Sequence, residues 1–516
     1  MIGFAILIIF LIAAVLMFLR KLPAILALPL MALAIALVEW LSGKLTLHEI
    51  SYAIFADGSL RLSEAIVISM VGGMVSFLMQ KAGVAEKFIR IGAELAGDDP
   101  WTVSLITLAL ISILFTTIGG LGAVIMVGTI VLPILASLGL RDYVCGAIVL
   151  FGISLGGLIN PGNWAMYTSV LQLDVAVVSD FALKMFYVVA MTAVCFVTFE
   201  LHLAGRFRFN RRSMIQASAG LAVILTGIFA YRSIVSTVGA ENCFFIAQWA
   251  VGLFLTFAFI CALVHGFRNW QAKTTEINWH SYLIPLIPLL LILVYEMPFV
   301  PAFLCGFIFG IISTLRRGSL NMTSRAVIEG SQSVIPAVVL MLGIGMLLNS
   351  ILGPSKNGAA AKWYKPAAVT ETGPASAGSV PAGSDQPQSP RVWPVTKDIE
   401  PLLAFAVPST GWHFVLIFTL LAPLALYRGP LNVWGLGYGV TSVLISMGVP
   451  AGAAMGALMA VGTVQGVSDP TNTQNVWIAN EVRVDVNTLM WRTILFTWAA
   501  ALAGLVIAGL RFYQAA

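Results

Sequence analysis

Long apolar runs, separated by short polar turns, make up most of this chain. A helix that spans a membrane needs about 20 apolar residues, and runs of that length follow one another from end to end. The pattern predicts an all-α polytopic membrane protein. The expected apolar segments are 2–19, 24–41, 62–81, 101–118, 121–138, 143–170, 182–203, 214–231, 244–265, 281–296, 299–315, 330–352, 412–427, 430–448, 451–478 and 488–511.

Two of these segments are interrupted by the same polar pattern, an Asx-Pro pair followed two residues later by asparagine. Asn160-Pro161-Gly162-Asn163 lies in 143–170, and Asp469-Pro470-Thr471-Asn472 lies 309 residues further on, in 451–478. Proline and amide side chains free backbone groups that lipid cannot satisfy. Such breaks are typical of the discontinuous helices that form solute sites in secondary transporters.

Two stretches, 101–138 and 412–448, each contain a pair of apolar segments that only a few turn residues separate. The first turn, Thr116 to Gly122, is rich in glycine, and the second contains Tyr427 to Asn432. We expect both pairs to be re-entrant hairpins that enter and leave the membrane on one side. About 12 crossings then remain among the apolar segments.

A second alignment supports an internal repeat. Asp57-Gly58-Ser59 matches Glu329-Gly330-Ser331 at a spacing of 272, which also pairs Gly73 with Gly345. This spacing is smaller than the spacing of 309 between the two breaks, so the second half must contain an insertion between the two alignments. The proline- and serine-rich stretch 353–400 supplies it as a flexible extracytoplasmic segment. The alternative is that glycines align by accident in a chain that has 47 of them.

These alignments define three parts of the chain. The first repeat covers 1–203, with the hairpin 101–138 and the broken helix 143–170. Linker helices fill 204–279. The second repeat covers 280–516, with the hairpin 412–448 and the broken helix 451–478. Nine segments precede the second repeat, and an odd number inverts its orientation in the membrane.

Composition and charge agree with this reading. The chain of 516 residues is 59% hydrophobic and 10% charged, far from the soluble average. Basic loop residues gather on one side of the expected topology, which is therefore cytoplasmic, with both termini outside. The five cysteines show no metal-site or disulfide spacing. We find no motif of a hydrolase, nucleotide-binding or metal enzyme, so we expect neither enzymatic activity nor a cofactor.

Inverted repeats, each with scaffold helices, an amphipathic arm, a re-entrant hairpin and a broken helix, resemble the ion transporter superfamily of secondary carriers. That group includes gluconate permeases, citrate transporters and dicarboxylate transporters. The stretch from Asp57 to Leu140 is similar to the gluconate permease pattern, including the turn Gly119-Gly120-Leu121-Gly122. The end of the chain, from Asn475-Val476-Trp477 to Trp491, is similar as well. The resemblance implies organic-acid substrates and symport with an ion.

Polar residues at the breaks and turns are the candidates for binding. A helix N-terminus attracts anions and a free C-terminal carbonyl attracts cations. The candidate substrate-binding residues are Thr116, Thr117, Gly119, Gly120, Asn160, Asn163, Arg428, Ser468, Thr471, Asn472 and Thr473. For ion coupling we expect Asp469 and Asn160, with a Na⁺ site near this pair. The alternatives are that the amides only cap broken backbone, that Arg428 is an interfacial topology charge, and that Asp469 is its structural partner.

The sequence therefore predicts a secondary active transporter of small organic anions, such as sugar acids, dicarboxylates or tricarboxylates, by proton or sodium symport with alternating access. An antiporter or exporter of the same fold is the first alternative, and a channel is the second. The expected partners are the anion, H⁺ or Na⁺ and membrane lipid, with a homodimer left open and nucleic acid excluded. We expect the protein in a bacterial inner membrane.

Overall fold

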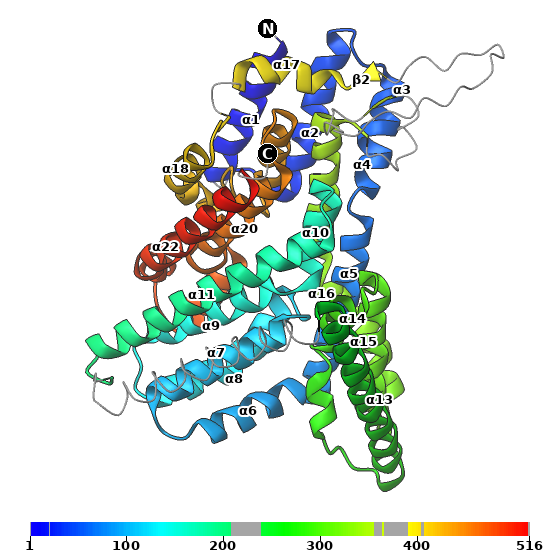
Figure 1. The fold of residues 1–516 in the computed structure, drawn as a ribbon, viewed down its shortest axis with the longest axis vertical. Coiled ribbons are helices and arrows are strands. Elements are labelled where there is room, and N and C mark those ends of the chain that lie inside the picture. Colours follow the sequence, from blue (N-terminus) through cyan, green and yellow to red (C-terminus); the bar gives the residue numbers. More distant parts are fainter. Residues whose placement is uncertain are drawn as a thin grey trace, which may run out of the picture.

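The computed structural model describes residues 2–19, 21–207, 239–354, 364–365, 391–403 and 407–513. Helices make up almost all of this, so the protein is an all-α polytopic membrane protein (Figure 1). In the described residues, nine helices are long and apolar enough to span a membrane, or up to ten if a bent pair is one span. Four shorter apolar helices add to these. The expected segment 214–231 lies outside the described residues.

The helices of the first repeat follow the predicted segments closely. They are α1 (Ile2–Phe18), α2 (Ala24–Leu41), α3 (Leu47–Glu49), the π-helical η1 (Ile50–Ala56), α4 (Asp57–Leu60), α5 (Ser63–Ala82), α6 (Val84–Ala96), α7 (Pro100–Phe115), α8 (Gly120–Ser137), α9 (Asp142–Leu158), α10 (Pro161–Leu171) and α11 (Val175–Leu203). A long helix, α13 (Ala240–Ala272), comes between the repeats.

The second repeat has the same order of elements. They are η2 (Trp279–Leu283), α14 (Ile287–Tyr295), α15 (Phe299–Ser313), α16 (Ser319–Leu352), the strands β1 (Tyr364–Lys365) and β2 (Arg391–Val392), α17 (Pro394–Leu403), α18 (Gly411–Leu421), the 3-10 segment η5 (Ala422–Arg428), α19 (Gly437–Ser446), α20 (Ala451–Ser468), α21 (Thr473–Glu481) and α22 (Val486–Phe512). The two strands pair in parallel.

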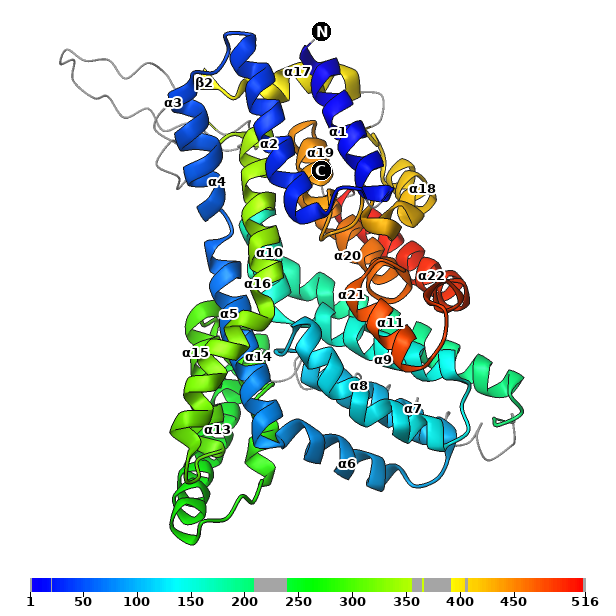
Figure 2. The ribbon, with the colours of Figure 1, turned by 180° about the vertical axis from the view of Figure 1, so that it is seen from behind.

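The helices α5 and α16 lie side by side in the centre of the molecule (Figures 1 and 2). Gly58 packs against the backbone of Gly345 and Met346, and Gly73 packs against the backbone of Gly330. A Cβ atom at any of these four glycines would collide with the opposite main chain. Since the spacing of 272 relates Gly58 to Gly330 and Gly73 to Gly345, the two contacts are images of each other in an antiparallel crossing. This is the form of contact that an inverted repeat requires.

The two breaks differ in shape. The helices α9 and α10 meet at 53°, and Pro161 stands at the first position of α10, where its missing N–H is not needed. The second break, between α20 and α21, interrupts a 31-residue apolar stretch from Ala451 to Glu481 without so large a bend. Both breaks bring helix ends into the interior of the protein.

Two details of the second repeat differ from the sequence prediction. The insertion was predicted to run to residue 400, but from Pro394 on the chain forms the amphipathic helix α17, the counterpart of α6. The reason is that Trp393 is fully buried and donates from its indole nitrogen to the carbonyl of Ser350. The second hairpin turn is also longer than predicted, because Tyr427 and Arg428 have positive φ angles and α19 begins only at Gly437.

Candidate functional site

A cavity with a volume of about 570 Å³ lies between the two repeats. Its lining comes from both hairpin turns, both breaks and the central helices α5 and α16. Ligand sites in proteins usually have volumes of roughly 300–1,000 Å³. The cavity is therefore large enough for a small organic molecule.

Most of the residues predicted as a site meet in the lining of this cavity. The lining includes Thr117, Gly119, Gly120, Asn160, Asn163, Arg428, Asp469, Asn472 and Thr473. Three predicted residues, Thr116, Ser468 and Thr471, are not part of it. The Ser468 hydroxyl instead lies 2.9 Å from the hydroxyls of both Thr493 and Thr497 on α22.

The first hairpin turn is held by hydroxyl groups. Thr116 donates from Oγ1 to the carbonyl of Pro285 at 2.9 Å, and Thr117 donates to the same oxygen. Both threonines are buried. After them, Gly120 takes a positive φ of 81° and begins α8, so the N-terminus of this helix faces the cavity. Backbone N–H groups at such an end favour an anion.

Asn160 connects the first break to the first hairpin. Its Nδ2 donates to the carbonyl of Phe115, near the end of α7, at 3.0 Å, and its Oδ1 accepts from the N–H of Gly162 at 2.8 Å. Nearby, Asn163 donates to the carbonyl of Gly157 at 2.7 Å. The amides therefore satisfy backbone groups that the break leaves free, as the capping alternative expected. They still line the cavity, so capping and binding are compatible.

Asp469 has the equivalent place in the second break, and its side chain is only 1% exposed. Its Oδ1 accepts hydrogen bonds from the N–H of Tyr427 at 2.9 Å and from the N–H and hydroxyl of Thr471 at 2.9 and 2.7 Å. Its Oδ2 accepts from Nδ2 of Asn432 at 3.2 Å. Four donors stabilise a buried carboxylate without a cation. Its role in ion coupling stays a prediction.

Arg428 lies in the long second turn and is half-buried. Arg428 and Asp469 are the charged residues among the described residues that line the cavity. Among the described residues, no ion pair joins Arg428 to Asp469, and no hydrogen bond from its guanidinium is found. The structure thus gives no support for the alternative in which the two form a structural pair.

Several lining residues escaped the sequence analysis. Gln465 accepts a hydrogen bond from the N–H of Val433 at 2.8 Å and so connects α20 to the second turn. Tyr167 and Tyr438, one from each repeat, have ring centroids 5.9 Å apart. A glutamine within an apolar helix was a signal that could have been read. The tyrosines were not recognisable, because aromatic residues are common in apolar segments.

No family model matches this sequence, and no curated protein does. The fold is similar to the YdaH transporter of Alcanivorax borkumensis, with 13% identity, a TM-score of 0.47, and coverage of 88% of this chain and 86% of that one. It is also similar to MtrF of Neisseria gonorrhoeae, described within a class of antimetabolite efflux pumps, with 12% identity, a TM-score of 0.46, and coverage of 93% and 84%. The resemblance to the ion transporter superfamily stays an expectation. Likenesses at this level assign neither a family nor a substrate to the chain.

Proposed function

We propose that this protein is a secondary transporter of organic anions, and that Arg428 binds the anion in the cavity between the repeats. The proposal rests on a difference in hydrogen bonding between the two charged residues that line the cavity. The Asp469 carboxylate accepts four hydrogen bonds, whereas the Arg428 guanidinium makes none with a described residue. An unpaired guanidinium in a cavity of a membrane protein favours a carboxylate, which it can bind through two parallel hydrogen bonds.

The rest of the lining indicates what kind of anion fits best. The lining combines the polar residues of the breaks and turns with four aromatic side chains, those of Phe115, Phe303, Tyr167 and Tyr438. Aromatic side chains favour burial of an apolar substrate body, and their ring carbons offer no hydrogen bond to the hydroxyls of a sugar acid. We therefore infer a preference for carboxylates with an apolar or aromatic body over sugar acids of the same charge.

The inverted repeats suggest how the cavity could open to each side in turn. In transporters built this way, one repeat moves against the other around a central site. A gradient of H⁺ or Na⁺ would drive accumulation of the anion.

The test is transport by purified protein in sealed vesicles, after a thermal-shift screen of aromatic, aliphatic and hydroxylated carboxylates with and without Na⁺. A transporter accumulates the anion against its gradient and stops when the H⁺ and Na⁺ gradients are dissipated. Downhill flux that ignores both gradients would make the protein a channel. Loading the vesicles and imposing the gradient in each direction separates import from export.

A further inference from the structure

A fully buried carboxyl group lies far from the cavity, in the last turn of α2. The side chain of Glu39 is 0% exposed, and neither of its carboxyl oxygens accepts a hydrogen bond from a described residue. The hydroxyl of Ser42, three residues on, donates instead to the main-chain carbonyl of Glu39 at 2.7 Å. A buried carboxylate with no donor is strongly unfavourable.

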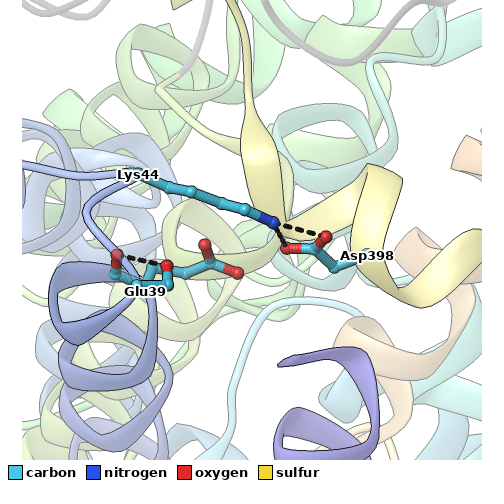
Figure 3. Close-up of polar contacts among 4 residues, drawn as sticks. Glu39, Lys44 and Asp398 are labelled. Carbon is cyan, nitrogen blue, oxygen red and sulfur yellow. Dashed lines mark hydrogen bonds and ion pairs between the residues drawn. The ribbon is translucent and has the colours of Figure 1, made fainter. Parts of the chain in front are cut away.

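The Glu39 carboxyl is directed toward a second carboxyl group on the helix α17 (Figure 3). This is Asp398, which forms an ion pair with Lys44 from the loop after α2; Lys44 Nζ lies 2.5 Å from Asp398 Oδ1 and also contacts Oδ2. The cluster thus contains two carboxyl groups and one ammonium group. If both carboxyls were ionised, one negative charge would remain uncompensated beside another.

On α17 itself the other charged residues are Lys397, whose side chain is exposed, and Glu400. The helix α1, which packs against both α2 and α17, has no titratable side chain. On α16 the charged residues are Arg325 and Glu329, in its first three turns, whereas α17 is bonded to its last turn. Lys44 and Asp398 are the groups whose charges act on Glu39.

We propose that Glu39 and Asp398 bind one exchangeable proton between them, and that this proton holds α17 against the end of α2. A shared proton removes the excess charge and turns Glu39 into a hydrogen-bond donor to Asp398. Loss of the proton leaves two carboxylates in contact, whose repulsion favours the separation of α17 from α2.

The position of α17 gives this proton site a consequence for the rest of the molecule. Its start is bonded to the end of α16, where Trp393 and Thr396 donate to the carbonyls of Ser350 and Ile351. Its end leads into the second hairpin, which carries Arg428. The Glu39–Asp398 pair would therefore make the mobility of this hairpin depend on pH.

Hydrogen exchange of the α17 amides between pH 5 and pH 8, corrected for intrinsic rates, tests the proposal on the purified full chain. In the wild-type protein, protection should fall as pH rises, by up to about tenfold per pH unit when one proton is linked to opening. In Glu39→Gln the amide stays neutral and can donate to Asp398, so protection should stay high at every pH. Asp398→Asn should also remove the pH dependence.

The control is Glu329→Gln, which removes a half-buried carboxylate paired with Arg325 on α16. In this variant the protection of the α17 amides should change with pH as it does in the wild-type protein. The proposal would be overturned if the protection of α17 in Glu39→Gln depended on pH as strongly as in the wild type. It would also be overturned if the protection in the wild type did not change with pH. Infrared difference spectra of the wild-type protein between the same pH values provide a test that needs no variant, since the proton must appear as a protonated-carboxyl band that disappears at high pH.

Discussion

At the scale of single residues, the two breaks use equivalent positions in opposite ways. Asn160 donates to a carbonyl at the end of the first hairpin helix, and Asp469 accepts from an N–H group in the second hairpin turn. Each side chain thus fixes a hairpin to the break of its own repeat. The choice between amide and carboxylate follows from whether the hairpin presents an acceptor or a donor.

Asp469→Asn should therefore destabilise the protein, although it changes the shape of the side chain little. The Nδ2 of Asn432 cannot turn away, because it also donates to Ala425 and its Oδ1 accepts from the N–H of Trp434. An amide at 469 would place N–H against N–H, at a cost of roughly 1–3 kcal/mol. We expect a lower midpoint of thermal unfolding. Asp485→Asn is the control, because this exposed residue caps α22 and asparagine caps a helix equally well.

Arg428→Lys should weaken binding of the anion without a comparable loss of stability. A lysine keeps the positive charge but cannot form the planar two-bond contact with a carboxylate. A charge-assisted contact contributes about 1.5–3 kcal/mol, so the apparent affinity should fall by roughly tenfold or more. Titration of the best ligand from the thermal-shift screen measures this. Arg90→Lys, at an exposed residue of α6, should bind as the wild type does, and an unchanged affinity in Arg428→Lys would remove the guanidinium from the site.

The positions of these residues could be predicted from the sequence, but their partners could not. A proline with amides in an apolar segment marks a break wherever it occurs. The partner of Asp469 is the N–H of Tyr427, 42 residues away along the chain, and the conformation of that turn depends on tertiary packing. The carboxyl pair of Glu39 and Asp398 was missed for the same reason, since it joins helices separated by 359 residues.

At the scale of elements, the antiparallel packing of α4 and α5 against α16 determines how the repeats fit together. Four glycines let the two main chains touch, which a side chain of any size would prevent. The sequence showed these glycines as a repeat, because the spacing of 272 relates them. It did not show that each contacts the image of the other, which follows only when the helices pack.

Gly73→Ala should disrupt this crossing. A methyl group there would meet the carbonyl oxygen of Gly330, and a main-chain atom in a packed helix has little room to move. Overpacking of this kind costs about 1–3 kcal/mol or more. We expect a lower melting temperature and aggregation on size-exclusion chromatography. In Gly122→Ala nothing lies within 4 Å of the new atom, so helix propensity alone should leave stability equal or slightly higher.

At the scale of the whole molecule, the same crossing relates the ends of the two repeats. The pairs Gly58 with Gly345 and Gly73 with Gly330 require that the chain runs through α4 and α5 in the direction opposite to that of α16. Basic loop residues predicted which side is cytoplasmic, and the structure supplies the relative direction of the helices. From the two together we expect the start of α16 on the cytoplasmic side and the end of α2 outside.

Single cysteines at Leu41 and Leu320 should therefore react from opposite sides of a sealed membrane. Leu41 ends α2 and is 77% exposed, and Leu320 begins α16 and is 78% exposed, so the two sites are matched in accessibility. In a background without the five native cysteines, an impermeant maleimide should label Leu41→Cys in intact cells and Leu320→Cys only after the membrane is opened. Labelling of both from the same side would contradict the inverted arrangement. The reverse pattern would keep the inverted repeat but would place the basic loops, and both termini, on the sides opposite to those proposed.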